Sequence, residues 1–249
     1  MLLERGYLSK LWDLPGFAFT MIILDLMHVS DLGICQYLLG NVIYELFKQM
    51  GGLVTNPEPV MGKLLKMIKD AAKLPELKIQ APVNKLTLSM VRRQGTDPKL
   101  RTKASETRRM LYVVDYLLDK EFPADTDHER DRKACVWNLA EFYRELEKWE
   151  KGGFSASRCA ALGRTHVNIY TQLSRDHRHL VELWGFHAYK FYPKHHLFIH
   201  LIEDGIFYAD NPRDVWAYAD ESAIGDAVEV AESCNPLYII RNVIEKQRL

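Results

Sequence analysis

The sequence has few cysteines and no excess of charge of either sign. Its 249 residues include four cysteines, and no two of them form a Cys-x-x-Cys pair. The four are Cys35, Cys135, Cys159 and Cys234. This spacing argues against a zinc ribbon, and buried free thiols in a reducing compartment are the simpler interpretation. Lysine plus arginine equals aspartate plus glutamate, at 33 each, so a nucleic-acid partner would need a local basic patch.

Long apolar runs and the common catalytic loops are missing as well. No apolar run reaches the roughly 18 residues that span a bilayer, and the first residues have no signal-peptide pattern. There is no glycine-rich phosphate loop and no Gly-x-Ser-x-Gly nucleophile turn. We therefore expect an intracellular protein of ordinary globular composition, without a membrane partner.

Helical periodicity dominates what is present, and the expected fold class is mainly α, a helical bundle with one short strand near the N-terminus. The apolar run 17–24 indicates that strand. Apolar residues at helical spacing predict the main helices near 30–50, 61–72, 100–119, 127–151, 157–184, 193–206, 220–233 and 237–247. Ser30 is expected to cap the first helix, and Thr126 with Glu129 forms a capping box for the fourth. Gly33 and Gly40 lie inside a helical pattern, which indicates close packing there.

The junction at Asp25 is the first candidate site. Asp25 follows the predicted strand directly, and His28 comes three residues later. A carboxylate at the end of a rigid strand can hold a divalent metal ion, because the strand fixes its oxygens. An aspartate at such a junction also commonly caps a turn or a helix. The pattern leaves both interpretations open.

A second candidate is the His-rich segment from Lys194 to His200. His196 and His200 are four residues apart and share one helix face, a spacing that suits zinc, with Glu203 as a further ligand. The glutamate that follows the first histidine of a metalloprotease motif is missing. A polar helix edge is the alternative.

Two further features carry charge. The acidic pair Asp220-Glu221 opens a predicted helix, where it either stabilises the helix dipole or presents a metal ligand. Basic clusters occur at Arg92-Arg93, at 99–109 and at 175–179. Such clusters can follow a phosphate backbone, whereas a solvated helix face is the alternative.

Several of these pieces occur in an order that resembles a known family. The runs Leu14-Pro15-Gly16, Asp25-Leu-Met27-His28-Val-Ser-Asp31-Leu32-Gly33 and Gly40-Asn41 resemble DDE-type transposase-like proteins related to the CACTA (En/Spm) group. The run Lys194 to Leu201 is similar to their His-rich segment, and Trp216 to Glu221 to the place of their last acidic residue. The run Lys103 to Arg108 resembles their helical insertion.

The resemblance implies a partial RNase H-like core interrupted by a helical insertion. The chain then divides into a strand–helix remnant (1–52), the insertion (53–185) and C-terminal helices with the last acid (186–249). In such enzymes three carboxylates hold two Mg²⁺ or Mn²⁺ ions that act on a DNA phosphodiester. Asp25 matches the second acid and Glu221 the third, while His28, His196 and His200 are weaker candidates near the metals.

The first acid has no counterpart, because Glu4 and Asp13 lie on no strand pattern and only residues 1–24 precede Asp25. The resemblance thus implies the C-terminal part of such a protein: an incomplete or inactive DNA strand-transfer domain that binds DNA in the nucleus. Two other functions stay open. One is a noncatalytic, all-helical protein-interaction module, and the other is a metal-dependent hydrolase built on His196, His200 and Glu203.

Overall fold

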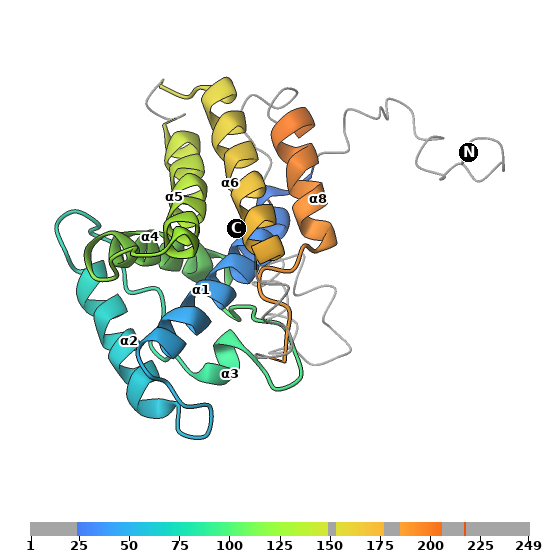
Figure 1. The fold of residues 1–249 in the computed structure, drawn as a ribbon. Coiled ribbons are helices and arrows are strands. Elements are labelled where there is room, and N and C mark those ends of the chain that lie inside the picture. The colour runs from blue at the N-terminus through green and yellow to red at the C-terminus, as the bar shows by residue number, and fades with distance from the viewer. Residues whose placement is uncertain (1–23, 149–152, 177–184, 206–216, 218–249) are drawn as a thin grey trace, which may run out of the picture.

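The computed structural model describes residues 24–148, 153–176, 185–205 and 217 (Figure 1). This part of the chain is mainly helical and contains no strand, as the sequence predicted for the bulk of the fold. Apart from Leu24, the predicted strand 17–24 lies outside the described residues. So do the predicted helices 220–233 and 237–247.

Seven α-helices and two π-helical segments make up the described part. In chain order they are η4 (Met27–Ile34), α1 (Cys35–Gln49), α2 (Glu58–Ala72), α3 (Leu88–Val91), α4 (Ala104–Lys120), α5 (Asp127–Glu147), α6 (Ala156–Asp176), α8 (Pro193–His200) and η7 (Leu201–Gly205). None of these helices is both long enough and apolar enough to cross a bilayer.

The helices pack around α1, which runs through the middle of the molecule (Figure 1). α5 and α6 lie side by side, α4 packs against α5 and α2, and α8 packs against η4. Among the described residues, one hydrophobic core extends from Leu26 to Ile202. Elements of all three predicted segments (1–52, 53–185 and 186–249) contribute to it, and the division into these segments stays a prediction.

Local sequence signals account for several helix ends. The Thr126 hydroxyl accepts a 3.2 Å hydrogen bond from the backbone N–H of Glu129, whose carboxylate accepts one of 2.9 Å from the N–H of Thr126. This is the predicted capping box at the start of α5. Gly51 has a φ of 78° just after α1, where the sequence predicted the helix to end.

The start of the first helix was predicted wrongly. η4 begins at Met27, and Ser30 lies buried inside it, with its hydroxyl hydrogen-bonded to that of Tyr143 at 2.8 Å. Ser30 is therefore not a cap. The helix bends at Gly33, whose φ of −117° and ψ of −109° are not helical.

The start of α4 also differs from the prediction near residue 100, because the helix begins at Ala104. Residues 99–103 precede the helix and form a non-helical segment, whose backbone is hydrogen-bonded to other helices. The N–H of Leu100 donates to the carbonyl of Gln36 (2.8 Å), and the N–H of Lys99 donates to that of Val91 (2.9 Å). These bonds to α1 and α3 replace the helical bonds and hold the segment across α1.

The described cysteines, Cys35, Cys135 and Cys159, are buried free thiols, as predicted. Burial raises the pKa of each thiol. All three are therefore protonated and unreactive near neutral pH. Cys234 lies outside the described residues.

Candidate functional site

The Asp25 carboxylate closes the turn that leads into η4. Its Oδ2 accepts a 3.0 Å hydrogen bond from the backbone N–H of His28, and its Oδ1 accepts one of 3.2 Å from the N–H of Met27. The imidazole Nδ1 of His28 also contacts Oδ2. Asp25 therefore does what a capping aspartate does, one of the two roles that its place in the sequence allowed.

A fourth donor reaches Asp25 from the far end of the chain. The backbone N–H of Ala217 donates a 2.8 Å hydrogen bond to Oδ1. Ala217 belongs to the sequence run Trp216–Glu221, and it is the one residue of that run that the structure describes. Glu221 itself lies outside the described residues, and its place in a metal site with Asp25 stays a prediction.

These donors determine the ionisation of Asp25. Partial burial raises its pKa, but the hydrogen bonds from Ala217, His28 and Met27 together outweigh burial and hold the pKa below its ordinary value of 3.8. The group is therefore a carboxylate at neutral pH. Its negative charge is matched by backbone dipoles and by the imidazole.

The same donors decide whether Asp25 has free lone pairs for the Mg²⁺ or Mn²⁺ that the resemblance implies. A carboxylate offers about four lone-pair sites, and Met27, His28 and Ala217 already supply four donors to them. A hard cation needs several oxygen ligands with accessible lone pairs. In this arrangement Asp25 does not fit a metal ion, because one of its protein donors would first have to leave.

The His-rich segment lies next to this junction. Lys194, in the first turn of α8, donates hydrogen bonds to the carbonyls of His28 (2.8 Å) and Leu32 (3.2 Å), which ties α8 to η4. His195 is buried, whereas His196 and His200 are exposed. Within the described ranges no three His, Cys, Asp or Glu side chains gather closely enough to hold a metal ion.

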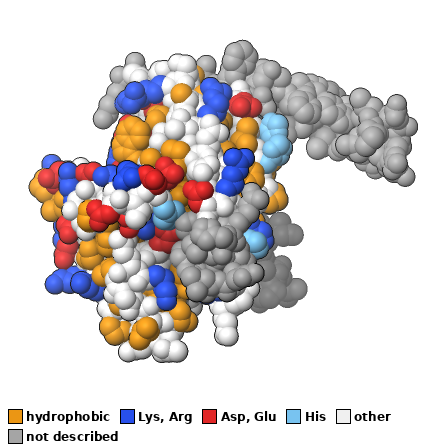
Figure 2. Space-filling model, in the orientation of Figure 1, with side chains coloured by type: hydrophobic (Ala, Val, Ile, Leu, Met, Phe, Trp, Pro, Cys, Tyr) orange, Lys and Arg blue, Asp and Glu red, His pale blue; other side chains and the backbone are white. Residues whose placement is uncertain are grey.

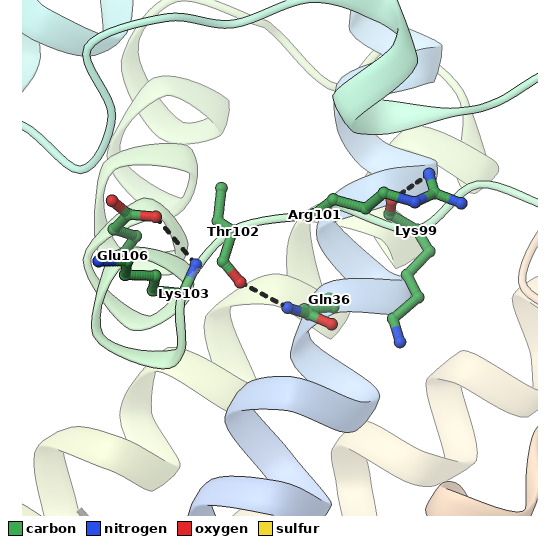
Figure 3. A pocket seen from close by; sticks show the side chains of 6 residues that line it. All are labelled: Gln36, Lys99, Arg101, Thr102, Lys103 and Glu106. Atoms are coloured by element: carbon green, nitrogen blue, oxygen red, sulfur yellow. Dashed lines mark hydrogen bonds between the residues drawn. The ribbon is translucent and has the colours of Figure 1, made fainter. Parts of the chain in front are cut away.

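The second part of the site is an open pocket of about 600 Å³ around the 99–103 segment. Its lining side chains are Gln36, Lys99, Arg101, Thr102, Lys103 and Glu106 (Figure 3). The Gln36 amide donates a 2.8 Å hydrogen bond to the Thr102 carbonyl and so fixes the segment on α1. The Glu106 carboxylate accepts a 2.9 Å hydrogen bond from the backbone N–H of Lys103 at the start of α4.

Gly40 makes this crossing possible. A Cβ atom at residue 40 would lie 2.5 Å from the backbone nitrogen of Lys99 and 2.6 Å from its Cα, closer than atoms can approach. Gln36 and Gly40 are four residues apart and share one face of α1. The close packing that the sequence predicted at Gly40 is therefore the contact that places the basic segment.

The cations of this segment repel one another. Partial burial, followed by the charges of Lys194 and Arg101, lowers the pKa of the Lys99 ammonium, and burial followed by Arg93 lowers that of Arg101. Among the described residues no carboxylate forms an ion pair with Lys99, Arg101 or Lys103. Cations held together without a counter-ion raise the local positive potential and favour an anionic ligand.

This charge is local. The face in Figure 2 shows Lys and Arg side chains interspersed with Asp and Glu, in keeping with a net charge of zero. The pocket stands out because three of its six side chains are cationic and one is acidic. A protein with no net charge needs a local basic patch of this kind to bind nucleic acid.

Aromatic rings border the basic segment. The rings of Tyr37 and Tyr192 stack with their centroids 4.1 Å apart, and the Lys99 ammonium lies 4.9 Å from the centroid of Tyr37. The Tyr192 hydroxyl donates a 2.6 Å hydrogen bond to Asp97. Next to Tyr192, the ring of Phe191 is 41% exposed. The sequence analysis missed Gln36, Tyr37 and Tyr192, because their contacts join segments far apart in the chain.

Other members of the predicted basic clusters point elsewhere. Arg108 donates a 2.6 Å hydrogen bond to Asp31, whose side chain is fully buried. Arg109 bonds the Gln80 side chain, and Arg92 lies over the ring of Phe186 at 4.2 Å. The cluster 99–109 is therefore divided, and only its first part lines the pocket. Of the cluster 175–179, residues 177–179 lie outside the described residues.

Comparisons of this chain with protein-family models, with curated proteins and with solved structures found no match.

Proposed function

We propose that this protein is a transposase-derived DNA-binding protein that does not cleave DNA. In this proposal the phosphates of DNA contact the basic segment 99–103, and Asp25 has a structural role. The observation that carries the proposal is the group of three cations, Lys99, Arg101 and Lys103, around one open pocket without an ion-pair partner among the described residues.

The geometry of the segment supports a phosphate ligand. Its backbone is fixed on α1 through Gln36 and through the close approach at Gly40, so the cations are held in place before any ligand arrives. Preorganised charges lose less conformational entropy on binding than charges on a free loop. Lys99 also repels Lys194 and Arg101, and a phosphate between these cations would relieve that repulsion.

The relationship to DDE-type transposases is supported by the way its quoted motifs assemble. The Asp25–Gly33 run, the His-rich run on α8 and Ala217 of the Trp216–Glu221 run meet at one place, through the bonds of Lys194 and Asp25. The absence of cleavage is inferred from the carboxylate of Asp25, whose lone pairs already accept protein donors.

The test is a DNA-binding measurement on the whole chain. Fluorescence anisotropy with a labelled duplex compares the unchanged protein with the Lys99→Gln/Arg101→Gln variant. We expect binding at low salt, weakened about tenfold or more by the two substitutions. The matched control is Lys63→Gln/Lys66→Gln, which removes the same charge from the exposed face of α2. Equal weakening by both pairs would contradict the assignment of the site.

A noncatalytic helical interaction module is the second candidate. The loop between α1 and α2 exposes two apolar side chains, Leu53 at 62% and Val54 at 53%, which could contact a partner protein. If the protein is such a module, it should show no measurable affinity for duplex DNA at low salt. Affinity for DNA that depends on Lys99 and Arg101 favours the first candidate.

A further inference from the structure

We infer that His196 and His200 form a chelate for a divalent transition-metal ion on the exposed face of α8. Their Nε2 atoms lie 3.2 Å apart, and both side chains are exposed to solvent. Two nitrogens bound to one tetrahedral ion at about 2.0–2.1 Å are about 3.3 Å from each other. The spacing in the structure is therefore close to the spacing that such an ion requires.

The helix fixes this geometry. His196 and His200 are one turn apart in α8, a helix of eight residues that Pro193 opens. Their rings are 4.6 Å apart between centroids and nearly perpendicular, at 84°, so the two Nε2 atoms approach one another without stacking of the rings. In the structure the two nitrogens form a hydrogen bond, in which one imidazole N–H donates to the other ring. A metal ion would bind both Nε2 atoms once the donating ring takes the neutral tautomer with its proton on Nδ1.

The donor set determines which ion binds. Imidazole nitrogens suit zinc, copper and nickel, whereas magnesium and manganese favour carboxylate and water oxygens. This chelate is thus chemically separate from any Mg²⁺ or Mn²⁺ site at Asp25. Two imidazole nitrogens leave coordination positions that water can fill, and both side chains are exposed. We therefore expect an ion that exchanges with solvent.

Binding at this place has a structural consequence. An ion that joins His196 to His200 spans one turn of α8 and restrains it. Lys194 of the same helix holds the carbonyls of His28 and Leu32, at 2.8 Å and 3.2 Å. A bound ion should therefore slow hydrogen exchange of the α8 backbone, an effect that does not depend on DNA.

The test is isothermal titration of untagged protein with ZnCl₂, together with thermal melting with and without the ion. We expect one zinc ion per chain and a rise in Tm. The zinc affinity should fall about tenfold or more in His196→Gln and in His200→Gln, because each substitution removes the chelate. The rise in Tm should become smaller in both variants for the same reason. His187→Gln is the control, since His187 is exposed on the segment before α8.

Three further measurements test this proposal separately from the proposed function. Asp25→Asn should leave zinc binding unchanged, and MgCl₂ should give no heat that depends on His196. Electron paramagnetic resonance of the Cu²⁺-loaded protein should show nitrogen ligands in the unchanged protein and fewer in His200→Gln. Zinc affinity that is the same in the unchanged protein and in the His196→Gln/His200→Gln variant would overturn the chelate.

Discussion

The backbone N–H of Ala217 donates a 2.8 Å hydrogen bond to Oδ1 of Asp25, across 192 positions of the sequence. Three further donors, from Met27 and His28, reach the same carboxylate. One side chain therefore caps the start of η4 and also binds the backbone of Ala217. This arrangement makes Asp25 a structural anchor in our account, and it leads to the first prediction.

Asp25→Ala should lower the free energy of unfolding by about 1–3 kcal/mol, since several hydrogen bonds to a charged group and a helix cap are lost together. Urea unfolding measures this change. DNA affinity should stay within about twofold, because Asp25 does not line the basic pocket. Asp70→Ala, at an exposed position of α2, is the control and should change stability by less than about 0.5 kcal/mol. A loss of DNA affinity without a loss of stability would assign Asp25 to the ligand instead.

Gly40→Ala should displace the 99–103 segment, because the new methyl group would overlap the backbone of Lys99. We expect a loss of about 1–3 kcal/mol in stability together with weaker DNA binding. Gly62→Ala in α2 is a matched control, since nothing lies within 4 Å of an added Cβ there. This control should gain up to about 1 kcal/mol from helix propensity. Unchanged DNA binding by a folded Gly40→Ala protein would show that the segment's position does not matter.

Arg108→Ala should be strongly destabilising, by about 3–5 kcal/mol, because it removes the guanidinium that pairs with the fully buried carboxylate of Asp31. The Asp31→Asn/Arg108→Met variant should recover part of this loss, since neither replacement carries a charge and asparagine can still accept a hydrogen bond from Tyr143. Chemical denaturation of the two variants measures the loss and its partial recovery. If Arg108→Met alone weakened DNA binding as much as Lys99→Gln does, Arg108 would belong to the binding site.

Stability should fall as the pH drops below 6.5. Burial lowers the pKa of His166 to about 4 and, with repulsion from His166, that of His195 to about 3, both from an ordinary value of 6.5. Between 6.5 and these values only the unfolded chain binds the two protons, so acid favours unfolding. Each histidine should cost of the order of 2 kcal/mol by pH 4.5.

The measurement is the free energy of unfolding at several pH values between 7 and 4.5, for the unchanged protein and for His166→Asn/His195→Gln. Asparagine can still donate to the Cys135 carbonyl, and glutamine can still accept from the N–H of Tyr192. The variant should lose less stability over this range. Equal slopes for the two proteins would contradict the buried, neutral state of these histidines.

The periodic pattern of the sequence predicted most of the helices, because it reports which residues face the core. In α4 the expected inward residues Met110, Leu111, Val114, Leu117 and Leu118 are all buried. The start of that helix was missed by a few residues. The reason is tertiary, since the N–H of Leu100 bonds the carbonyl of Gln36 in α1, far away in the sequence.

The candidate site could be predicted only in part. The sequence indicated the basic cluster 99–109, but helix geometry turns Arg108 inward to Asp31 and leaves Lys99, Arg101 and Lys103 around the pocket. The pattern at Asp25 allowed both a cap and a metal ligand. One of the donors to the carboxylate is the N–H of Ala217, 192 positions away. A local sequence pattern cannot predict that contact. The pairing of Asp25 with Glu221 stays a prediction.

The salt dependence of DNA binding tests the central claim most directly. Each phosphate contact contributes about 0.9 to the slope of log affinity against log salt concentration for duplex DNA. We predict that Lys99→Gln/Arg101→Gln lowers this slope by about 2, whereas Lys63→Gln/Lys66→Gln leaves it unchanged. The same slope for the unchanged protein and the Lys99→Gln/Arg101→Gln variant would show that DNA binds elsewhere, and it would contradict the account.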